Sequence, residues 1–199
     1  MGGLPLLISD MDNQTLIKLP TLEEVRTALF SMESNKTPRC DGFGAGFFKT
    51  YWSILKSDLF NSVAEFFRNG KILKEINHTF LALIPKMSSP SSIGHFRPIS
   101  LCSMVSKIIA KILANQLRPL LDKIISPFQS AFIPGRSIHD NILLTHEIMH
   151  KFKKLKSKQA WFALKIDMEK AYDRLEWDFV LQCFTELGFH VQWVSWVRE

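Results

Sequence analysis

Residues 161–176 of this 199-residue chain read WFALKIDMEKAYDRLE, an apolar run followed by an aspartate and then by a helix start. The apolar run at 161–166 predicts a short buried strand, because strands covered on both faces read as continuous apolar runs. Asp173 and Glu176 have the spacing of a capping box, which predicts a helix that ends at Gly188. Asp167 therefore lies between a strand end and a helix, where a carboxylate can face a cleft.

Two interpretations of Asp167 are open on this local pattern. A carboxylate there suits Mg2+, which takes a few protein oxygens and completes its shell with water and substrate phosphates. The alternative is that Asp167 accepts hydrogen bonds from nearby backbone amides, as aspartates in turns commonly do. The local pattern alone favours the alternative, so metal chemistry needs support from elsewhere in the sequence.

The rest of the chain predicts a helix-rich α+β fold. A capping box at 21–24 starts one helix, and Gly70 ends another. Two extended segments flank a polar loop, which is typical of a hairpin. Residues 134–135, Pro-Gly, predict a turn, and Ser137 is expected to cap the helix that follows. The predicted helices are 22–32, 47–67, 103–117, 137–156 and 174–187, and the predicted strands are 79–86, 95–99 and 161–166.

Charge is distributed unevenly along the chain. The 25 basic and 19 acidic side chains give a net charge of +6, and 46% hydrophobic residues argue against wholesale disorder. Residues 100–158 carry 10 basic and 3 acidic side chains, whereas residues 159–199 carry 4 basic and 7 acidic ones. A cationic middle before an anionic end is expected where one part contacts phosphates and the next holds a divalent metal.

Several protein classes are excluded by pattern. Cys40, Cys102 and Cys183 are too scattered for a disulfide framework or a zinc ribbon. The glycine-rich loop at 42–46 lacks the G-K-[ST] of a phosphate-binding P-loop. Without a signal peptide or an apolar stretch that spans a bilayer, we expect an intracellular protein, nuclear or cytoplasmic, that is neither secreted nor in a membrane. Metal-assisted phosphoryl chemistry remains the best physical interpretation.

Two sets of cations could contact phosphates. Lys86 and Arg97 flank the loop of the predicted hairpin, where they could clamp a triphosphate, although basic residues around hairpins are common. A lysine run at 151–158 ends the helix that Ser137 starts. Contact with a nucleic-acid backbone and a favourable interaction with the helix dipole explain this run equally well.

Four segments, taken in order, identify a family resemblance. They are NKTPRCDGF at 35–43; LIPK at 83–86 with FRPISLC at 96–102 and SKIIAK at 106–111; QSAFIPGRSIHDN at 129–141; and LKIDMEKAYDRLEW at 164–177. Together they resemble the reverse transcriptases of LINE-type (non-LTR) retrotransposons, particularly those of plants. The resemblance covers roughly residues 20–199 of the chain.

The resemblance implies the fingers and an incomplete palm of a right-hand polymerase, with a helix-rich α+β fold. It assigns residues 1–66 to an N-terminal extension and residues 67–199 to the fingers and the start of the palm. The implied activity is that of an RNA-directed DNA polymerase, a nucleotidyltransferase that uses Mg2+. Its implied partners are an RNA template, a DNA primer and deoxynucleoside triphosphates.

Specific residues match the family's functional positions. Asp167 matches the first catalytic aspartate, a ligand of both ions in two-metal nucleotidyl transfer, and Met168 would offer its backbone carbonyl to the metal. Tyr172 matches the aromatic side chain that selects deoxynucleotides. Arg97, and less securely Lys86, match the cations that hold the incoming triphosphate.

The implied nucleic-acid contacts lie in the middle of the chain. Gln129 and Arg136 fall in the template-side motif of the fingers. The basic span at 100–158 becomes a candidate grip on the template and primer. Its predicted contact residues are Lys107, Lys111, Lys153, Lys154 and Lys156.

The departures from the family pattern matter for activity. The sequence contains no Ala-Asp-Asp and no G-x-x-Q-G, and its glycine loop reads Pro-Arg-Cys-Asp where the family has Pro-Gly-Pro-Asp. One carboxylate does not hold two Mg2+ ions in a working geometry, so we expect this chain alone to be inactive, as a relic or as part of a longer gene. The alternatives are a non-catalytic nucleic-acid-binding module and a product that does not fold stably.

Overall fold

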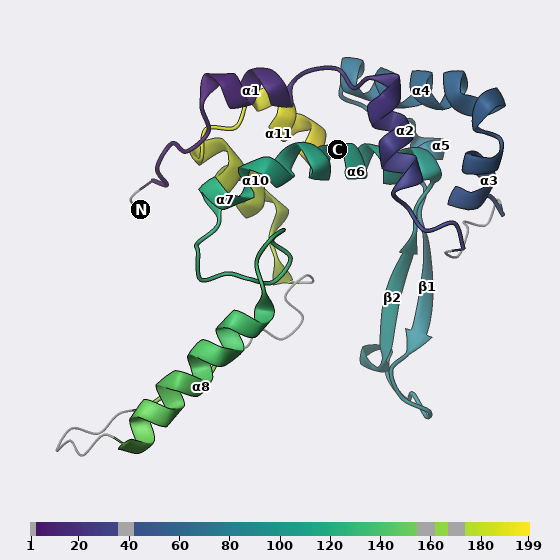
Figure 1. The fold of residues 1–199 in the computed structure, drawn as a ribbon. Coiled ribbons are helices and arrows are strands. Elements are labelled where there is room, and N and C mark those ends of the chain that lie inside the picture. Colours follow the sequence, from purple (N-terminus) through teal and green to yellow (C-terminus); the bar gives the residue numbers. More distant parts are fainter. Residues whose placement is uncertain (1–2, 36–41, 155–161, 167–173) are drawn as a thin grey trace. The chain divides into compact units, whose positions relative to one another are not determined.

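The computed structural model describes residues 3–35, 42–154, 162–166 and 174–199, and these form a helix-rich α+β structure (Figure 1). Within these ranges there is one two-stranded antiparallel sheet. The chain divides into two compact units. We call Asp10–Gln116 with His190–Glu199 the hairpin unit, and Met1–Ser9 with Leu117–Phe189 the loop unit. The predicted boundary between residues 66 and 67 concerns family domains and stays a prediction.

Helices make up most of the hairpin unit. The capping box at the start of α2 is present, with the Glu24 N–H donating to Thr21 Oγ over 3.2 Å and the Thr21 N–H donating to Glu24 Oε2 over 2.7 Å. α4 ends at Gly70 in the left-handed conformation, as predicted. The helices are α1 (Asp10–Leu16), α2 (Leu22–Phe30), α3 (Ala45–Thr50), α4 (Trp52–Asn69), α5 (Lys74–Asn77), α6 (Met104–Leu117) and α11 (Val191–Arg198).

The helix predicted at 47–67 is divided in two. α3 stops and α4 starts at Tyr51, whose φ of −97° and ψ of 22° are not helical. The break accompanies an aromatic cluster in which the Phe47 ring lies 4.3 Å from Phe43 and 4.9 Å from Tyr51, centroid to centroid. Helical periodicity does not reveal such a break, because the apolar spacing continues through it.

The core of the hairpin unit is formed by α2, α4, α6 and α11. Phe67 is fully buried and its ring packs edge-on against Trp196 at 4.9 Å. Trp193 is buried beside them and donates its indole N–H to Gln116 Oε1 over 3.3 Å. A buried indole with a partner keeps its burial favourable. Other buried side chains are Val25, Leu29, Val63, Ile108, Ile109 and Ile112.

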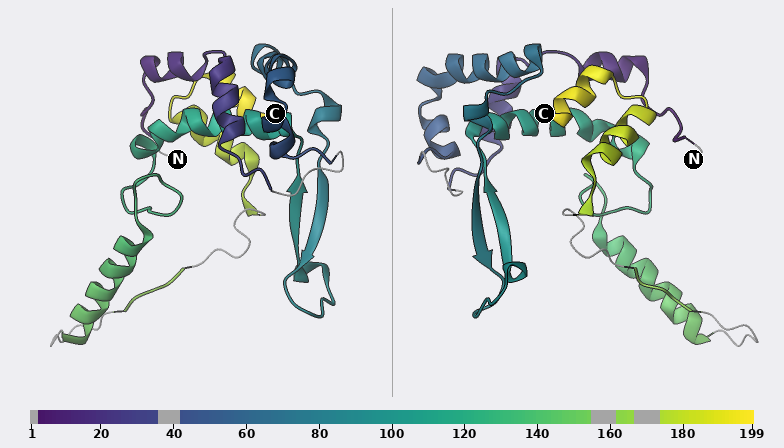
Figure 2. Two further views of the ribbon diagram at one scale, coloured as in Figure 1. Left: turned by 45° about the vertical axis from the view of Figure 1, so that its right-hand side comes forward. Right: turned by 180° about the vertical axis from the view of Figure 1, so that it is seen from behind.

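The sheet is the predicted hairpin. β1 (Phe80–Pro85) and β2 (Phe96–Leu101) pair antiparallel, from Phe80 opposite Leu101 to Pro85 opposite Phe96, around a loop with the 3-10 turn η1 (Ile93–His95). Most of its side chains are exposed, and in Figure 2 the ribbon extends away from α5 and α6. The hairpin therefore presents its side chains outside the core of its unit.

Four short or amphipathic elements make up the described loop unit: η2 (Arg118–Leu120), α7 (Leu121–Ile124), α8 (Ile138–Lys154) and α10 (Trp177–Glu186). Ser137 caps α8 as predicted, because its Oγ accepts the His139 N–H over 3.2 Å. No side chain of α8 is buried. α10 starts about three residues later than predicted, and Asp173, its predicted cap, lies outside the described residues.

The predicted buried strand at 161–166 is wrong for the residues that the structure describes. Residues 162–166 are not assigned to any sheet, and Phe162 and Ile166 are 85% and 84% exposed. A strand needs a hydrogen-bonded neighbour, and the sheet formed by the described residues contains only β1 and β2. An apolar run alone therefore overestimated burial here.

The N-terminal segment of the loop unit packs on the end of α10. The Leu7 and Ile8 N–H groups both donate to the Leu187 carbonyl, at 3.0 and 3.1 Å. Gly188, with φ +93°, ends the helix, and a Cβ on it would lie 3.1 Å from Leu6 Cδ2 and 3.3 Å from Ile8 O. Glycine is required here for both its conformation and its size.

A carboxylate supports the same contact. The pKa of Glu186 is lowered because the Gln182 side chain and then the Leu4 N–H donate to it, at 2.8 and 3.2 Å. A lowered pKa means that this stabilisation is present above the ordinary carboxylate pKa and is lost as the pH falls through the lowered value.

Replacing Gly188 tests this arrangement. Gly188→Ala combines a left-handed φ with close contacts, so we expect it to lower the free energy of unfolding by about 2–4 kcal/mol. Gly70→Ala is the matched control, since Gly70 also ends a helix at positive φ. A Cβ on Gly70 would lie 3.8 Å from Trp196 Cδ1, which is an ordinary contact. Thermal and urea unfolding of the full chain should show a clearly larger loss for Gly188→Ala, and equal losses would contradict the packing described here.

Candidate functional site

The predicted catalytic and metal-binding residues lie outside the described part of the chain. Asp167, Met168 and Tyr172 all fall within 167–173. Among the described residues, no group of three or more His, Cys, Asp or Glu side chains could hold a metal ion. The Mg2+ site expected at Asp167 therefore stays a prediction.

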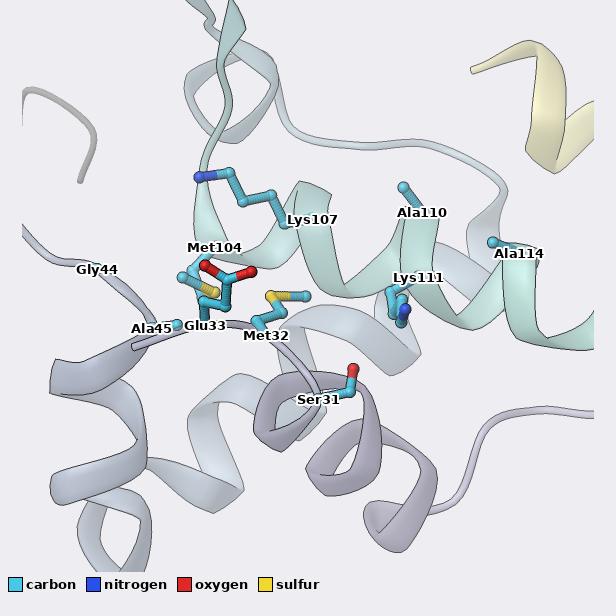
Figure 3. A pocket seen from close by; sticks show the side chains of 10 residues that line it. All are labelled: Ser31, Met32, Glu33, Gly44, Ala45, Met104, Lys107, Ala110, Lys111 and Ala114. Carbon is cyan, nitrogen blue, oxygen red and sulfur yellow. The ribbon is translucent and has the colours of Figure 1, made fainter. Parts of the chain in front are cut away.

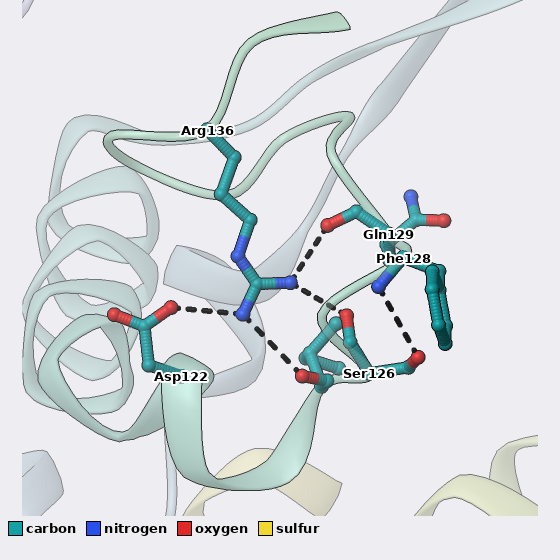
Figure 4. Close-up of polar contacts among 6 residues, drawn as sticks. Asp122, Ser126, Phe128, Gln129 and Arg136 are labelled. Atoms are coloured by element: carbon teal, nitrogen blue, oxygen red, sulfur yellow. Dashed lines mark hydrogen bonds and ion pairs between the residues drawn. The ribbon is translucent and has the colours of Figure 1, made fainter. Parts of the chain in front are cut away.

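A network of four hydrogen bonds in the loop unit centres on Arg136 (Figure 4). One guanidinium nitrogen donates to the carbonyls of Ser126 and Gln129, at 2.6 and 2.7 Å. The other donates to Asp122 Oδ1 at 2.9 Å and to the Ile125 carbonyl at 3.4 Å. The Arg136 side chain is only 18% exposed, whereas its partner Asp122 is 75% exposed, so the guanidinium is covered while the carboxylate faces solvent. Charge-assisted hydrogen bonds of this kind are about twice as strong as neutral ones.

We call residues 125–136 the Arg136 loop, and its chain reversal follows from the predicted Pro-Gly turn. Pro134 and Gly135 occupy the middle of a turn closed by the Arg136 N–H on the Ile133 carbonyl at 3.3 Å. Gly135 has φ +79°, as the third position of a type II turn requires. The Asn141 side chain, on α8, donates to the Phe128 carbonyl at 3.1 Å. The loop is thus held from α7, from within itself and from α8.

The Arg136 loop presents two aromatic rings to solvent. Phe128 is 79% exposed and Phe132 is 92% exposed. Among the described residues, Phe132 is the one non-glycine residue with positive φ, at 65°. A bulky side chain in the left-handed region costs about 1–3 kcal/mol, and such strain persists only where the surroundings impose it. Phe132 lies between Gln129 and Arg136, which are joined by a hydrogen bond of 2.7 Å.

The structure brings the two predicted template-side residues together. The Gln129 carbonyl accepts from Arg136, and its side-chain amide donates to the Ala131 carbonyl at 3.2 Å. Both side chains therefore donate hydrogen bonds to backbone carbonyls of the loop. Their role in nucleic-acid binding stays a prediction.

Lys86 and Arg97 lie on the same face of the hairpin. Arg97 is opposite Ile84, and the Lys86 N–H donates to the His95 carbonyl at 2.7 Å, which continues the register by one pair. Side chains two positions apart share a face, so Lys86 and Arg97 are diagonal neighbours. Both are exposed, and Lys86 Nζ also donates to the Gly94 carbonyl at 3.1 Å.

Lys107 and Lys111 line a pocket of about 510 Å³ in the hairpin unit (Figure 3). They lie one turn apart on α6, and the end of α2 and the start of α3 complete the walls. The remaining lining is mostly apolar, with Met32 and Met104 prominent and Glu33 as the acidic member. The pocket thus combines two cations with an apolar surface.

The described lysines at the end of α8 are exposed. Lys151, Lys153 and Lys154 occupy its last turn, and Lys156 lies outside the described residues. Their position at a helix C-terminus keeps both earlier interpretations open. No described helix is both long enough and apolar enough to cross a membrane.

One motif was missing from the predicted sites. His146-Glu147-Ile148-Met149-His150 has the H-E-x-x-H spacing, which puts two histidines on one face of α8. The spacing alone would have revealed it. No third ligand joins the pair among the described residues, so we assign no metal site there.

Comparison with known proteins decides the family. Residues 84–199, more than half of the chain, match the family model described as "Reverse transcriptase (RNA-dependent DNA polymerase)". The chain belongs to the reverse transcriptase family. The match begins in β1 and includes Lys86, Arg97, the Arg136 loop and Asp167.

Curated relatives of this reverse transcriptase chain come from mobile elements. It is 32% identical over 196 residues, 98% of the chain, to the "Transposon TX1 uncharacterized 149 kDa protein" of Xenopus laevis. It is 23% identical over 159 residues, 78% of the chain, to the "Retrovirus-related Pol polyprotein from type-1 retrotransposable element R1" of Bradysia coprophila. The chain spans 15% of the length of each of these two proteins.

Removing the Arg136 side chain should loosen the loop. Arg136→Ala leaves the carbonyls of Ser126, Gln129 and Ile125 without this donor, so we expect the free energy of unfolding to fall by about 1–3 kcal/mol. Chymotrypsin should also cut faster after Phe128 and Phe132. Arg118→Ala, at an exposed position in the same unit, is the control and should change stability by less than about 0.5 kcal/mol. Unchanged cleavage and stability in Arg136→Ala would mean that the network does not hold the loop.

Proposed function

We propose that this chain forms the fingers and the first part of the palm of a LINE-type (non-LTR), plant-like retrotransposon reverse transcriptase. In this proposal residues 1–66 are its N-terminal extension and residues 67–199 belong to the polymerase domain. The observation that carries the proposal is the family match over 84–199, within which the hairpin, the Arg136 loop and the Asp167 segment follow in the family's order.

The hairpin and the Asp167 segment handle the incoming nucleotide in this proposal. Lys86 and Arg97 hold the triphosphate, and their common face of the ribbon supports this role. Tyr172 crowds the sugar 2′ position. Asp167, with the Met168 carbonyl, contributes to a Mg2+ site, and the metal supplies charge stabilisation at the reacting phosphate when bound.

The basic middle of the chain contacts the RNA template and DNA primer. Lys107 and Lys111 lie one turn apart on α6, so one phosphate group can lie near both. Lys153 and Lys154 are exposed at the end of α8, and Lys156 follows in sequence. Gln129 and Arg136 belong to the template side.

These 199 residues do not contain every catalytic carboxylate that the family uses. They include no Ala-Asp-Asp, and a single aspartate does not hold two Mg2+ ions. In this proposal the isolated chain binds nucleic acid but does not extend a primer. A non-catalytic nucleic-acid-binding module is the second candidate, favoured by the exposed lysines, and it makes the same binding prediction.

Primer extension tests the catalytic part. With an RNA template, a DNA primer, deoxynucleotides and Mg2+, the 199-residue chain should give no product above that of Asp167→Asn. Extension that depends on Asp167 would contradict the proposed incompleteness. Supplying the downstream residues of a relative that contain Ala-Asp-Asp, fused to this chain, should restore Asp167-dependent synthesis if the chain is part of a polymerase, and should not if it is only a binding module.

Salt dependence tests the binding part. Affinity for a primer–template should fall steeply between 50 and 200 mM salt, because each neutralised phosphate releases a counterion. Reversing Lys153, Lys154 and Lys156 to Glu should weaken binding and reduce the logarithmic salt slope by about 2–3. The control reverses Lys56, Lys71 and Lys74, exposed lysines of the hairpin unit, with the same change in net charge. Equal effects of the two triple variants would mean that only net charge matters.

A further inference from the structure

We propose that the Arg136 loop is a stacking platform for the bases of single-stranded RNA, on which Phe128 and Phe132 contact the bases and Arg136 is a positioning residue. The inference rests on the proposed function, since it takes the RNA template as the ligand. It changes the expected role of Arg136 from a direct nucleic-acid contact to a residue that holds the loop, and it adds two residues that the sequence patterns did not single out.

Arg136 makes four hydrogen bonds within the loop unit. Its guanidinium donates to three backbone carbonyls and to Asp122, over 2.6 to 3.4 Å. The carboxylate of Asp122 compensates its charge, and the side chain is largely covered. A phosphate would have to displace these partners, so the guanidinium is better suited to holding the loop than to binding the backbone of a nucleic acid.

The rings of Phe128 and Phe132 are both highly exposed. Folding normally removes phenylalanine from water, yet Phe128 and Phe132 stand almost fully in solvent on a loop that is otherwise tightly held. Phe132 does so in the left-handed conformation. Evolution can replace a strained, exposed ring at no cost in packing, so its presence points to a contact made outside the chain.

The surroundings of the rings favour a nucleobase over a protein surface. Polar Gln129 and Ser130 separate Phe128 from Phe132 in sequence, so the rings are single flat surfaces and not one broad apolar patch, which a protein partner would bury. Residues 117–154 carry six basic and three acidic side chains; Arg118, Lys123 and Arg136 lie in or just before the loop, and the other three basic residues lie in the last turn of α8. Stacking of bases on single aromatic rings in a cationic setting is the usual mode of binding single-stranded nucleic acid.

Phe132 offers a substitution that tests contact without harming the fold. Asparagine tolerates the left-handed region well, so Phe132→Asn should leave the melting temperature unchanged or higher. Phe128→Ala removes the second ring. Phe162→Ala is the matched control, because Phe162 is 85% exposed in the same unit but lies outside the Arg136 loop.

The binding experiment uses two fluorescent 12-nucleotide probes, oligouridylate and an abasic strand of the same charge, with the full 199-residue chain. Phe132→Asn and Phe128→Ala should each weaken oligouridylate binding by roughly five- to hundredfold, the range that loss of one stacked base gives. Both should leave binding of the abasic probe unchanged, and Phe162→Ala should bind both probes like the wild type.

Arg136→Gln distinguishes a positioning role from direct phosphate contact. As a positioning residue, it should weaken oligouridylate binding about as much as loss of both rings, with an unchanged salt slope. In a variant that already lacks both rings, Arg136→Gln should cause little further loss of oligouridylate affinity. A direct contact would instead lower the slope by about 0.7, the value for one phosphate of a single strand, and would weaken binding of the abasic probe as well.

The outcomes separate this inference from the proposed function. If the wild type binds both probes and the ring variants bind as tightly as it does, the stacking platform is wrong while nucleic-acid binding stands. If the wild type binds neither probe, the stacking platform is wrong, and binding of the primer–template decides the proposed function separately. If the ring variants only reduce self-association, measured by sedimentation, the rings form a protein contact and the inference is overturned.

Discussion

The hydrogen bonds of one guanidinium hold together a loop that exposes two phenylalanine rings. The Arg136 guanidinium donates hydrogen bonds to the carbonyls of Ser126, Ile125 and Gln129. It also forms an ion pair with Asp122. Backbone carbonyls in a loop need such donors, because no helix or sheet satisfies them. In the loop held by these contacts, Phe128 and Phe132 are exposed and Phe132 has a left-handed φ.

The hairpin shows a different constraint. Its strands are apolar on both faces, and its register places Lys86 and Arg97 together near the loop end. A two-stranded ribbon buries few of its own side chains, so the apolar residues of β1 and β2 remain accessible in the described structure. Lys86 and Arg97, the proposed triphosphate contacts, are thus carried on the exposed hairpin of the hairpin unit.

Local signals allowed much of the fold to be predicted. The capping box at 21–24, the helix end at Gly70, the turn at 134–135 and the cap at Ser137 each depend on atoms within four residues of one another. The predicted strand at 161–166 failed because its outcome depends on a partner strand elsewhere in the chain. The break at Tyr51 depends on aromatic packing, which apolar spacing does not reveal. The pair His146 and His150 was missed although its i, i+4 spacing is present in the sequence.

The sequence by itself determined the family, the order of its motifs, and where most helices and turns begin and end. Only the tertiary structure decided which partners the candidate side chains contact and which of them are exposed. It showed Arg136 bound to residues 7 to 14 positions away, Phe128 and Phe132 in solvent, and Lys107 and Lys111 on one pocket. The physical reason is that caps and turns are closed by neighbouring atoms, whereas burial and hydrogen-bond partners depend on which distant segments the fold brings together.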